Sequence, residues 1–297
     1  MDMKLLQNVL FPFSLIYGTI IALRNFLFDK GILSSQTPKI PNIGIGNLNV
    51  GGTGKSIVVD YLISIFKAQH SLVVISRGYK RKTRGVIVAN STSTAHDIGD
   101  EPYQFLSKHN VGIVVAEKRK RALKVISEFK KLPDRILFDD IMQHRYIKPK
   151  CLIVTTTYSK PYFQDSLLPK GRLRESAKQI KRAQIILVNK CPENMSIKDQ
   201  RFFFKKIKPL ADKRIYFTTI VYENEIKNRV KSINLNSITN SFLLITGISN
   251  PMYLINFFNK GGFYFLHLKY SNHHNFKENE IKEIKKKQKG RKIITTE

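Results

Sequence analysis

The 297-residue sequence has few cysteines, no tryptophan and a shortage of acidic side chains. Its two cysteines, Cys151 and Cys191, are too few for a disulfide framework or a cysteine-based zinc site, which favours a reducing compartment. Asp and Glu number 22 against 51 Lys and Arg, so the formal net charge is +29. Such a charge is typical of a protein with an anionic partner: nucleic acid, an acidic membrane or a phosphorylated substrate. A Lys-, Ile- and Asn-rich composition also arises in AT-rich genomes, so the charge alone identifies no ligand.

No internal repeat is present, and short apolar runs alternate with helical segments over the first two thirds of the chain. The length allows one large or two ordinary domains. The pattern predicts strands at 42–48, 71–76, 86–89, 111–116, 135–138, 152–156 and 185–189, with helices at 57–67, 100–108 and 118–130 among them. This alternation is typical of an α/β fold with a parallel sheet and helices on both of its faces.

The last third of the sequence indicates a second, smaller α/β unit. Residues 215–221 read as an exposed or linking strand, and a polar stretch follows to residue 240. Strands are then predicted at 242–246 and 263–268 with a helix between them, and the lysine-rich run 280–292 reads as a solvated helix face. The predicted organisation is a membrane-associated helix (1–28), a nucleotide-binding domain (29–214), a linker (215–240) and a smaller domain (241–297).

The N-terminus carries an uncharged and mostly apolar run from Leu5 to Leu23, which is nearly the ~20 residues that span a bilayer. Pro12 and Gly18 interrupt it, which favours a helix buried shallowly in one leaflet over a spanning one. A helix in a soluble core is the alternative. In the membrane interpretation, three basic residues meet the lipid headgroups: Lys4, Arg24 and Lys30.

The segment Gly51-Gly52-Thr53-Gly54-Lys55-Ser56 has the composition of a phosphate-binding loop. Glycines let the backbone turn its N–H groups toward phosphates, Lys55 neutralises their charge, and the Ser56 hydroxyl binds Mg²⁺. Asn49 stands where the strict pattern has its first glycine. A predicted strand before the loop and an amphipathic helix after it support the assignment, because a helix N-terminus attracts anions. The sequence therefore predicts an ATP-using phosphotransferase.

Such enzymes commonly hold their metal with a second acidic element at the end of a neighbouring strand. Asp139 and Asp140 follow the predicted strand 135–138 and suit that role, although Asp is also common in turns. Together with Ser56 they form the predicted magnesium site.

Further segments occur in a fixed order: Ser76-Arg77-Gly78-Tyr79, Gly99-Asp100-Glu101-Pro102, Asp139-Asp140 with Gln143-His144-Arg145, Leu167 to Glu175, and His273-His274. This ordered series closely resembles the tetraacyldisaccharide 4'-kinase family of lipid A synthesis. The resemblance extends over most of the chain. It implies ATP and Mg²⁺ as ligands, an acylated disaccharide phosphate as acceptor, no nucleic acid, and a peripheral position on the cytoplasmic face of the inner membrane.

The resemblance also implies roles for single residues. Asp100 matches the base that takes the proton from the sugar 4'-hydroxyl, and His273 matches the histidine that pairs with it; the alternatives are a helix N-cap and a surface histidine. Arg174 and Glu175 match a segment at the glycolipid substrate, against the alternative of a surface ion pair. The implied nucleotide contacts are Asn49, Val50, Gly51, Gly52, Thr53, Gly54, Lys55, Ser56, Arg77 and Arg119.

Some positions depart from the family pattern. Ile141-Met142 replaces the usual Gly-Phe, Asn272 stands where an Asp commonly precedes the histidine, and Thr157 falls where Asp is common. The family also continues beyond the end of this sequence, so a final strand and helix are expected to be missing from the smaller domain.

Two other classes of protein remain as alternatives. A regulatory or chaperone P-loop GTPase or ATPase would carry an Asn-Lys-x-Asp signature; Asn189-Lys190 fits its start, but Pro192 stands at the Asp position. A nucleic-acid-binding protein would explain the charge, but the sequence contains no recognisable binding module.

Overall fold

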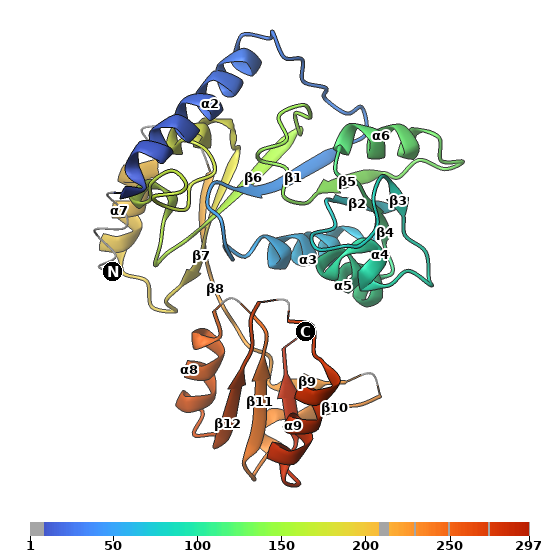
Figure 1. The fold of residues 1–297 in the computed structure, drawn as a ribbon, viewed down its shortest axis with the longest axis vertical. Helices are drawn as coiled ribbons and strands as arrows, with labels where there is room; N and C mark the ends of the chain where they lie inside the picture. Colours follow the sequence, from blue (N-terminus) through green and yellow to red (C-terminus); the bar gives the residue numbers. More distant parts are fainter. Residues whose placement is uncertain (1–8, 208–213, 229, 249, 273, 297) are drawn as a thin grey trace. The chain divides into compact units, whose positions relative to one another are not determined.

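The structure, a computed structural model, describes residues 9–207, 214–228, 230–248, 250–272 and 274–296. The chain divides into two compact units, Met1–Ile220 and Val221–Glu297. Each unit has its own sheet and its own hydrophobic core (Figure 1).

Eight strands form the sheet of the first unit, in the order β3-β4-β2-β5-β1-β6-β7-β8. Neighbouring strands are parallel except β3 and β4, which pair antiparallel at one edge. The predicted parallel sheet is thus confirmed, with one antiparallel edge strand. The strands are β1 (Asn42–Asn47), β2 (Leu72–Ser76), β3 (Ile87–Val88), β4 (Gly112–Val115), β5 (Arg135–Phe138), β6 (Cys151–Thr157), β7 (Ile185–Cys191) and β8 (Arg214–Thr219).

Helices cover both faces of this sheet, because its strands are apolar on both sides. In β2, Val73 and Ile75 belong to one core cluster, whereas Leu72 and Val74 belong to the other. The first cluster includes residues of α6 and α7, and the second includes residues of α3 and α5. The helices and 3₁₀ turns that follow β1 along the chain in this unit are α3 (Lys55–Phe66), α4 (Ala95–Ile98), α5 (Asp100–His109), α6 (Arg119–Ser127), η1 (Tyr162–Gln164), η2 (Ala177–Arg182) and α7 (Ile197–Ile207).

The topology brings the ends of several strands to one edge. β1 lies between β5 and β6, and the predicted phosphate loop leaves its carboxyl end. β2 and β5 run parallel to it and are followed by Arg77 and by Asp139. In open α/β sheets, ligands bind at this carboxyl edge.

Helix α2 (Phe11–Asp29) is apolar on its outside, and two of its three buried residues are polar. Ser14 and Asn25 are buried, and a Cβ atom at Gly18 would lie 2.8 Å from the Cδ1 atom of Leu167. Among the described helices, α2 is the one long and apolar enough to cross a membrane by length and composition. Its exposed apolar side chains are Phe11, Phe13, Leu15, Ile16, Ile20, Leu23 and Phe26.

Of the three basic residues expected at the lipid headgroups, Arg24 has a different partner. Arg24 does not face outward, because its guanidinium lies 2.9 Å from Glu175 in the body of the unit. Lys30 lies with its ammonium 5.8 Å from the ring centre of Phe26, and Lys4 is outside the described residues.

In the second unit, β12 (Phe265–Lys269), β11 (Phe242–Thr246) and β13 (Ile293–Thr295) form a parallel sheet with β11 in the middle. β9 (Glu225–Lys227) and β10 (Ser232–Asn234) form a separate antiparallel pair. The main core combines aliphatic and aromatic side chains, and in it Phe242 packs on Phe258 and Phe265. The remaining elements are η4 (Leu235–Ser237), α8 (Met252–Lys260) and α9 (Glu278–Gln288).

The strand expected at 215–221 as exposed or linking is an exposed edge strand. β8 pairs in parallel with β7, so it is the edge strand of the first sheet and not a linker. The predicted boundary at residue 214 precedes this strand, whereas the compact unit extends to Ile220. Most side chains of this edge strand are exposed, and for that reason its sequence resembles that of a linking segment.

We predict that Gly46→Ala destabilises the protein. A Cβ atom there would lie 2.6 Å from the Cβ atom and 2.9 Å from the backbone nitrogen of Met142, so the backbone of a buried strand must shift. Overpacking of this kind costs about 1–3 kcal/mol. Thermal unfolding should show a lower Tm, whereas Gly247→Ala, whose nearest neighbour is 3.5 Å away, should unfold near the wild-type temperature. Equal Tm values for the two variants would contradict the prediction.

Candidate active site

The loop after β1 has the backbone of a phosphate-binding loop. Gly51 and Gly54 have φ values of 107° and 89°, which residues with a Cβ atom rarely adopt. Gly54 is the N-cap of α3, so the helix begins at Lys55 with its N-terminus at the end of the loop. The start of the loop is fixed from outside, because Val50 N–H donates to the carbonyl of Arg172 over 2.7 Å.

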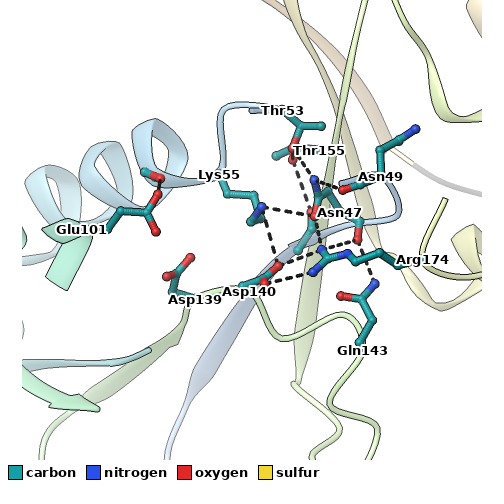
Figure 2. A network of polar contacts seen from close by, with 12 residues as sticks. Asn47, Asn49, Thr53, Lys55, Glu101, Asp139, Asp140, Gln143, Thr155 and Arg174 are labelled. Carbon is teal, nitrogen blue, oxygen red and sulfur yellow. Dashed lines mark hydrogen bonds and ion pairs between the residues drawn. The ribbon is translucent and has the colours of Figure 1, made fainter. Parts of the chain in front are cut away.

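Polar side chains support the loop from inside the sheet (Figure 2). The Asn47 amide donates to the carbonyl of Asn49 at 2.7 Å and to the Thr53 hydroxyl at 2.8 Å. Thr53 also shares a hydrogen bond of 2.8 Å with Thr155 of β6. The Asn49 amide donates to Asp165 at 2.9 Å. Asn47 and Thr155 were missed by the sequence analysis; the only signal was polar residues at the ends of apolar strands.

Lys55 and Arg174 meet at Asp140. The Lys55 ammonium lies 3.6 Å from the Asp140 carboxylate and donates to the Asn47 side-chain oxygen at 3.2 Å. Arg174 binds both carboxylate oxygens of Asp140, at 3.0 and 2.9 Å. Burial raises the pKa of Asp140, but Lys55 and Arg174 outweigh it and hold that pKa well below the usual range. Asp140 is therefore an anion at neutral pH.

Asp139 has the opposite environment although it is the next residue along the chain. Its carboxyl group is buried, one oxygen accepts a hydrogen bond of 2.9 Å from Ser76, and the other has no partner. Burial first, and then the charges of Glu101 and Asp140, raise the pKa of Asp139 to about 7. A cation near the unpartnered oxygen would favour the ionised form.

Glu101 brings a third carboxylate to this place and was missed as a site residue. The Ser56 hydroxyl donates a short hydrogen bond to it. Figure 2 shows Lys55 with Glu101 on one side, Arg174 and Asn47 on the other, and Asp139 and Asp140 below. The sequence could have identified Glu101, because it directly follows Asp100, the predicted catalytic base.

Asp100 is the first residue of α5 and is exposed. Gly99, with φ 91°, takes the N-cap position that the alternative interpretation gave to Asp100. Asp100 thus adjoins the residue that contacts Ser56, at the N-terminus of a helix.

Basic side chains also lie near Asp139 and Asp140. Arg119 stands among basic residues in the sequence, yet it is 2% exposed and donates to the carbonyl of Asp139 at 3.3 Å. Burial lowers the pKa of Arg119 to about 10, which leaves it charged at neutral pH. Burial, and then the charge of Arg119, lower the pKa of His144 to about 4. Arg77 is exposed at the end of β2, and its charge contributes to both pKa shifts.

Arg174 and Glu175 take separate partners. Arg174 points to Asp140, whereas Glu175 is fully buried between Arg24 of α2, 2.9 Å away, and Arg182. Glu175 is therefore not half of a surface ion pair with its neighbour. It holds α2 against the unit, and the Tyr17 hydroxyl adds a bond of 2.8 Å to the Arg174 carbonyl.

Three residues that depart from the family pattern are buried and contact other parts of the first unit. Ile141 and Met142 are buried at 2% and 1% exposure and lie against Gly44 and Gly46 of β1. Thr157 is buried at the end of β6, where its hydroxyl donates to the Lys160 carbonyl at 3.2 Å.

His273 lies outside the described residues, so its pairing with Asp100 stays a prediction. Within the described ranges no group of three or more His, Cys, Asp or Glu side chains could hold a metal ion by itself. Ser56, Glu101 and Asp139 nevertheless form a donor set that suits Mg²⁺, which takes one or two carboxylates and completes its shell with phosphate and water.

The pKa of Asp139 gives a pH prediction. Because it exceeds the unfolded value of about 3.9, the folded protein keeps a proton that the unfolded chain loses. The stability from this group is full below about pH 4 and is lost as the pH rises to about 7. In Asp139→Asn, unfolding midpoints should therefore fall less between pH 5 and pH 8 than in the wild type. The exposed Asp134→Asn should keep the wild-type slope, and the same slope in both variants would refute the assignment.

Comparisons with known proteins identify the family of the chain. A family model described as "Tetraacyldisaccharide-1-P 4'-kinase" matches residues 6–297. The tetraacyldisaccharide 4'-kinase of Flavobacterium psychrophilum is 40% identical over 99% of this chain and 87% of its own length. That of Bacteroides thetaiotaomicron is 38% identical over 97% and 80%. The crystal structure of LpxK from Aquifex aeolicus in complex with ATP matches with a TM-score of 0.78 and 26% identity, covering 98% of this chain and 88% of the other.

Proposed function

The chain belongs to the tetraacyldisaccharide 4'-kinase family, and on that premise we propose that it transfers the γ-phosphate of ATP to the 4'-hydroxyl of a tetraacyldisaccharide 1-phosphate in lipid A biosynthesis. The observation that carries the proposal is the meeting of the phosphate loop with Asp139, Asp140 and Arg174 at one edge of the sheet. A regulatory or chaperone NTPase would need the loop but no lipid acceptor. Dependence of ATP turnover on that acceptor separates the two.

The phosphate loop supplies the nucleotide end of the site. Its glycines and the N-terminus of α3 present backbone N–H groups to an anion. Lys55 lies at that N-terminus and stabilises the charge of the transferring phosphate. Arg77 and the buried Arg119 add positive charge behind Asp139 and Asp140.

Ser56, Glu101 and Asp139 would hold the magnesium ion, with Asp140 beside them. When bound, Mg²⁺ neutralises phosphate charge and orients the phosphates for transfer. Asp139 suits a cation because one buried oxygen has no partner. Asp140 is held by Arg174 and Lys55 and so keeps the surrounding cations in place.

Asp100 is the proposed base for the 4'-hydroxyl. Its support is that it begins α5 and directly precedes Glu101, the residue that contacts Ser56 of the phosphate loop. A carboxylate contributes modestly to phosphoryl transfer, because positioning and charge stabilisation carry most of the rate. His273 is proposed to pair with it.

Helix α2 is proposed to place the enzyme on the cytoplasmic face of the inner membrane, where the acylated substrate resides. The support is its reversed polarity, with Ser14 and Asn25 inward and apolar side chains outward. Such a face is costly in water but stable among acyl chains. Arg174 and Glu175 connect this helix to the phosphate site; Arg174 is the proposed substrate-side residue, and the buried Glu175 supports that side of the site by holding α2.

Two substitutions test the chemistry. Lys55→Ala should lower kcat by about 10²- to 10³-fold and Asp100→Ala by about 10²-fold, at the low end for a general base, with ATP affinity retained in the second. Phosphate transfer from ATP to the purified lipid is the measurement. Lys67→Ala, at the far end of α3, and Asp97→Asn, just before α5, serve as controls that keep most of the activity. Wild-type rates in either test variant would remove that residue from the mechanism.

A triple substitution of Ile16, Ile20 and Leu23 by Ser should abolish cosedimentation with phospholipid vesicles, because each side chain is more than half exposed on α2. A matched triple, Val88, Leu132 and Ile197 to Ser, changes exposed apolar residues elsewhere in the first unit and should leave binding intact. Loss of binding in both, or in neither, would contradict the assignment of α2 as the membrane contact.

A further inference from the structure

The end of β7 touches the phosphate loop, and the family assignment does not account for it. The Asn189 side-chain amide donates to the carbonyl of Thr53 over 2.8 Å. Lys190 donates to the carbonyl of Gly52 over 3.0 Å. Two consecutive residues of β7 thus bind two consecutive carbonyls of the loop. These are the residues that resembled the start of a guanine-specifying signature.

A local irregularity aims these side chains. The register between β7 and β8 shifts between Val188 and Cys191, and Lys190 has φ 60°, the left-handed conformation. Such a bulge redirects side chains out of the regular alternation of a strand. Asn189 is consequently buried at 6% exposure, and a Cβ atom at Gly54 would lie 2.8 Å from its amide nitrogen.

The orientation of the Asn189 amide is fixed from its other end. Its side-chain oxygen accepts a hydrogen bond of 2.8 Å from the hydroxyl of Thr218 in β8. The carbonyl of Thr53 can only accept, so the amide nitrogen must face it and the oxygen must face Thr218. β8 is the last strand of the first unit, and the chain continues from it into the second.

The carbonyls of Gly52 and Thr53 matter for nucleotide binding. A phosphate loop works when its N–H groups face the anion, and its carbonyls must then point away and find donors. A carbonyl that turned toward the phosphates would repel them. Donors fixed behind the loop therefore favour the binding conformation before any ligand arrives.

We propose that Asn189 is a positioning residue for the nucleotide, which holds the Thr53 carbonyl away from the phosphates, and that Thr218 acts through Asn189 by fixing its amide. The inference rests on the proposed function only in that the loop binds ATP; it does not depend on the acceptor.

The test measures ATP affinity directly, by titration calorimetry, in the full-length protein. Asn189→Asp is nearly isosteric but places a carboxylate oxygen against the Thr53 carbonyl, and it should weaken ATP binding at least tenfold. Thr218→Val keeps the shape of the side chain and removes only the hydroxyl; a loss of about three- to tenfold is expected. The control is Thr219→Val, because the adjacent hydroxyl donates to the Cys191 carbonyl at 2.9 Å and does not touch Asn189.

Two further readouts separate positioning from simple structural damage. In Thr218→Val, the KM for ATP should rise while the KM for the lipid and the Tm stay near wild type. Asn189→Ala should weaken ATP binding, and adding Thr218→Val to it should weaken binding no further, because Thr218 acts through Asn189.

Wild-type ATP affinity in folded Thr218→Val, or equal effects of Thr218→Val and Thr219→Val, would overturn the proposal; this holds even if the Asn189 variants fail to fold. Additive effects of the two substitutions would overturn the role of Thr218. A wild-type protein that binds ATP but transfers no phosphate to the lipid would refute the proposed acceptor and leave the inference standing.

Discussion

The ion pair between Arg174 and Asp140 is the interaction on which the arrangement of the site depends. The guanidinium binds both oxygens of Asp140 after β5 and also the backbone of Asn47 at the end of β1. The backbone of Arg174 donates to the carbonyl of Leu48 over 2.7 Å and accepts from Tyr17 of α2. One residue therefore joins two adjacent strands, the base of the phosphate loop and the N-terminal helix. Its planar group with several fixed donors suits this use better than a lysine would.

The same ion pair gives the two neighbouring carboxylates, Asp139 and Asp140, different environments. Asp140 is surrounded by cations and stays ionised, whereas Asp139 is buried with a raised pKa. Two adjacent acids with environments that push their pKa values apart are typical of sites that handle charge. Asp140 organises the protein around it, and Asp139 retains an unsatisfied oxygen for a ligand.

The sequence predicted what is local. The phosphate loop, the strands of the first sheet before β8 and the acidic pair after β5 lie in continuous segments whose pattern and glycine content determine their backbone. What it missed is formed by distant segments. Glu101 reaches Ser56, and Asn189 reaches Thr53, only because parallel strands and their helices bring their ends together. Burial was not visible in the sequence either, since Arg119 stands beside Lys118, Lys120 and Arg121 and yet packing covers it.

The reversed polarity of α2 determines how strongly the helix is attached to the rest of the protein in water and in lipid. Most apolar side chains of this helix point outward and Phe28 alone among them is buried, so its attachment also depends on Ser14, Tyr17 and the pair between Arg24 and Glu175. Hydrogen bonds and ion pairs of this kind strengthen as the local dielectric constant falls. If α2 lies in the membrane, lipid would therefore strengthen the attachment of the helix to the rest of the first unit. Aqueous buffer without detergent would weaken that attachment. The bilayer would then complete the tertiary structure of the enzyme as well as hold its substrate.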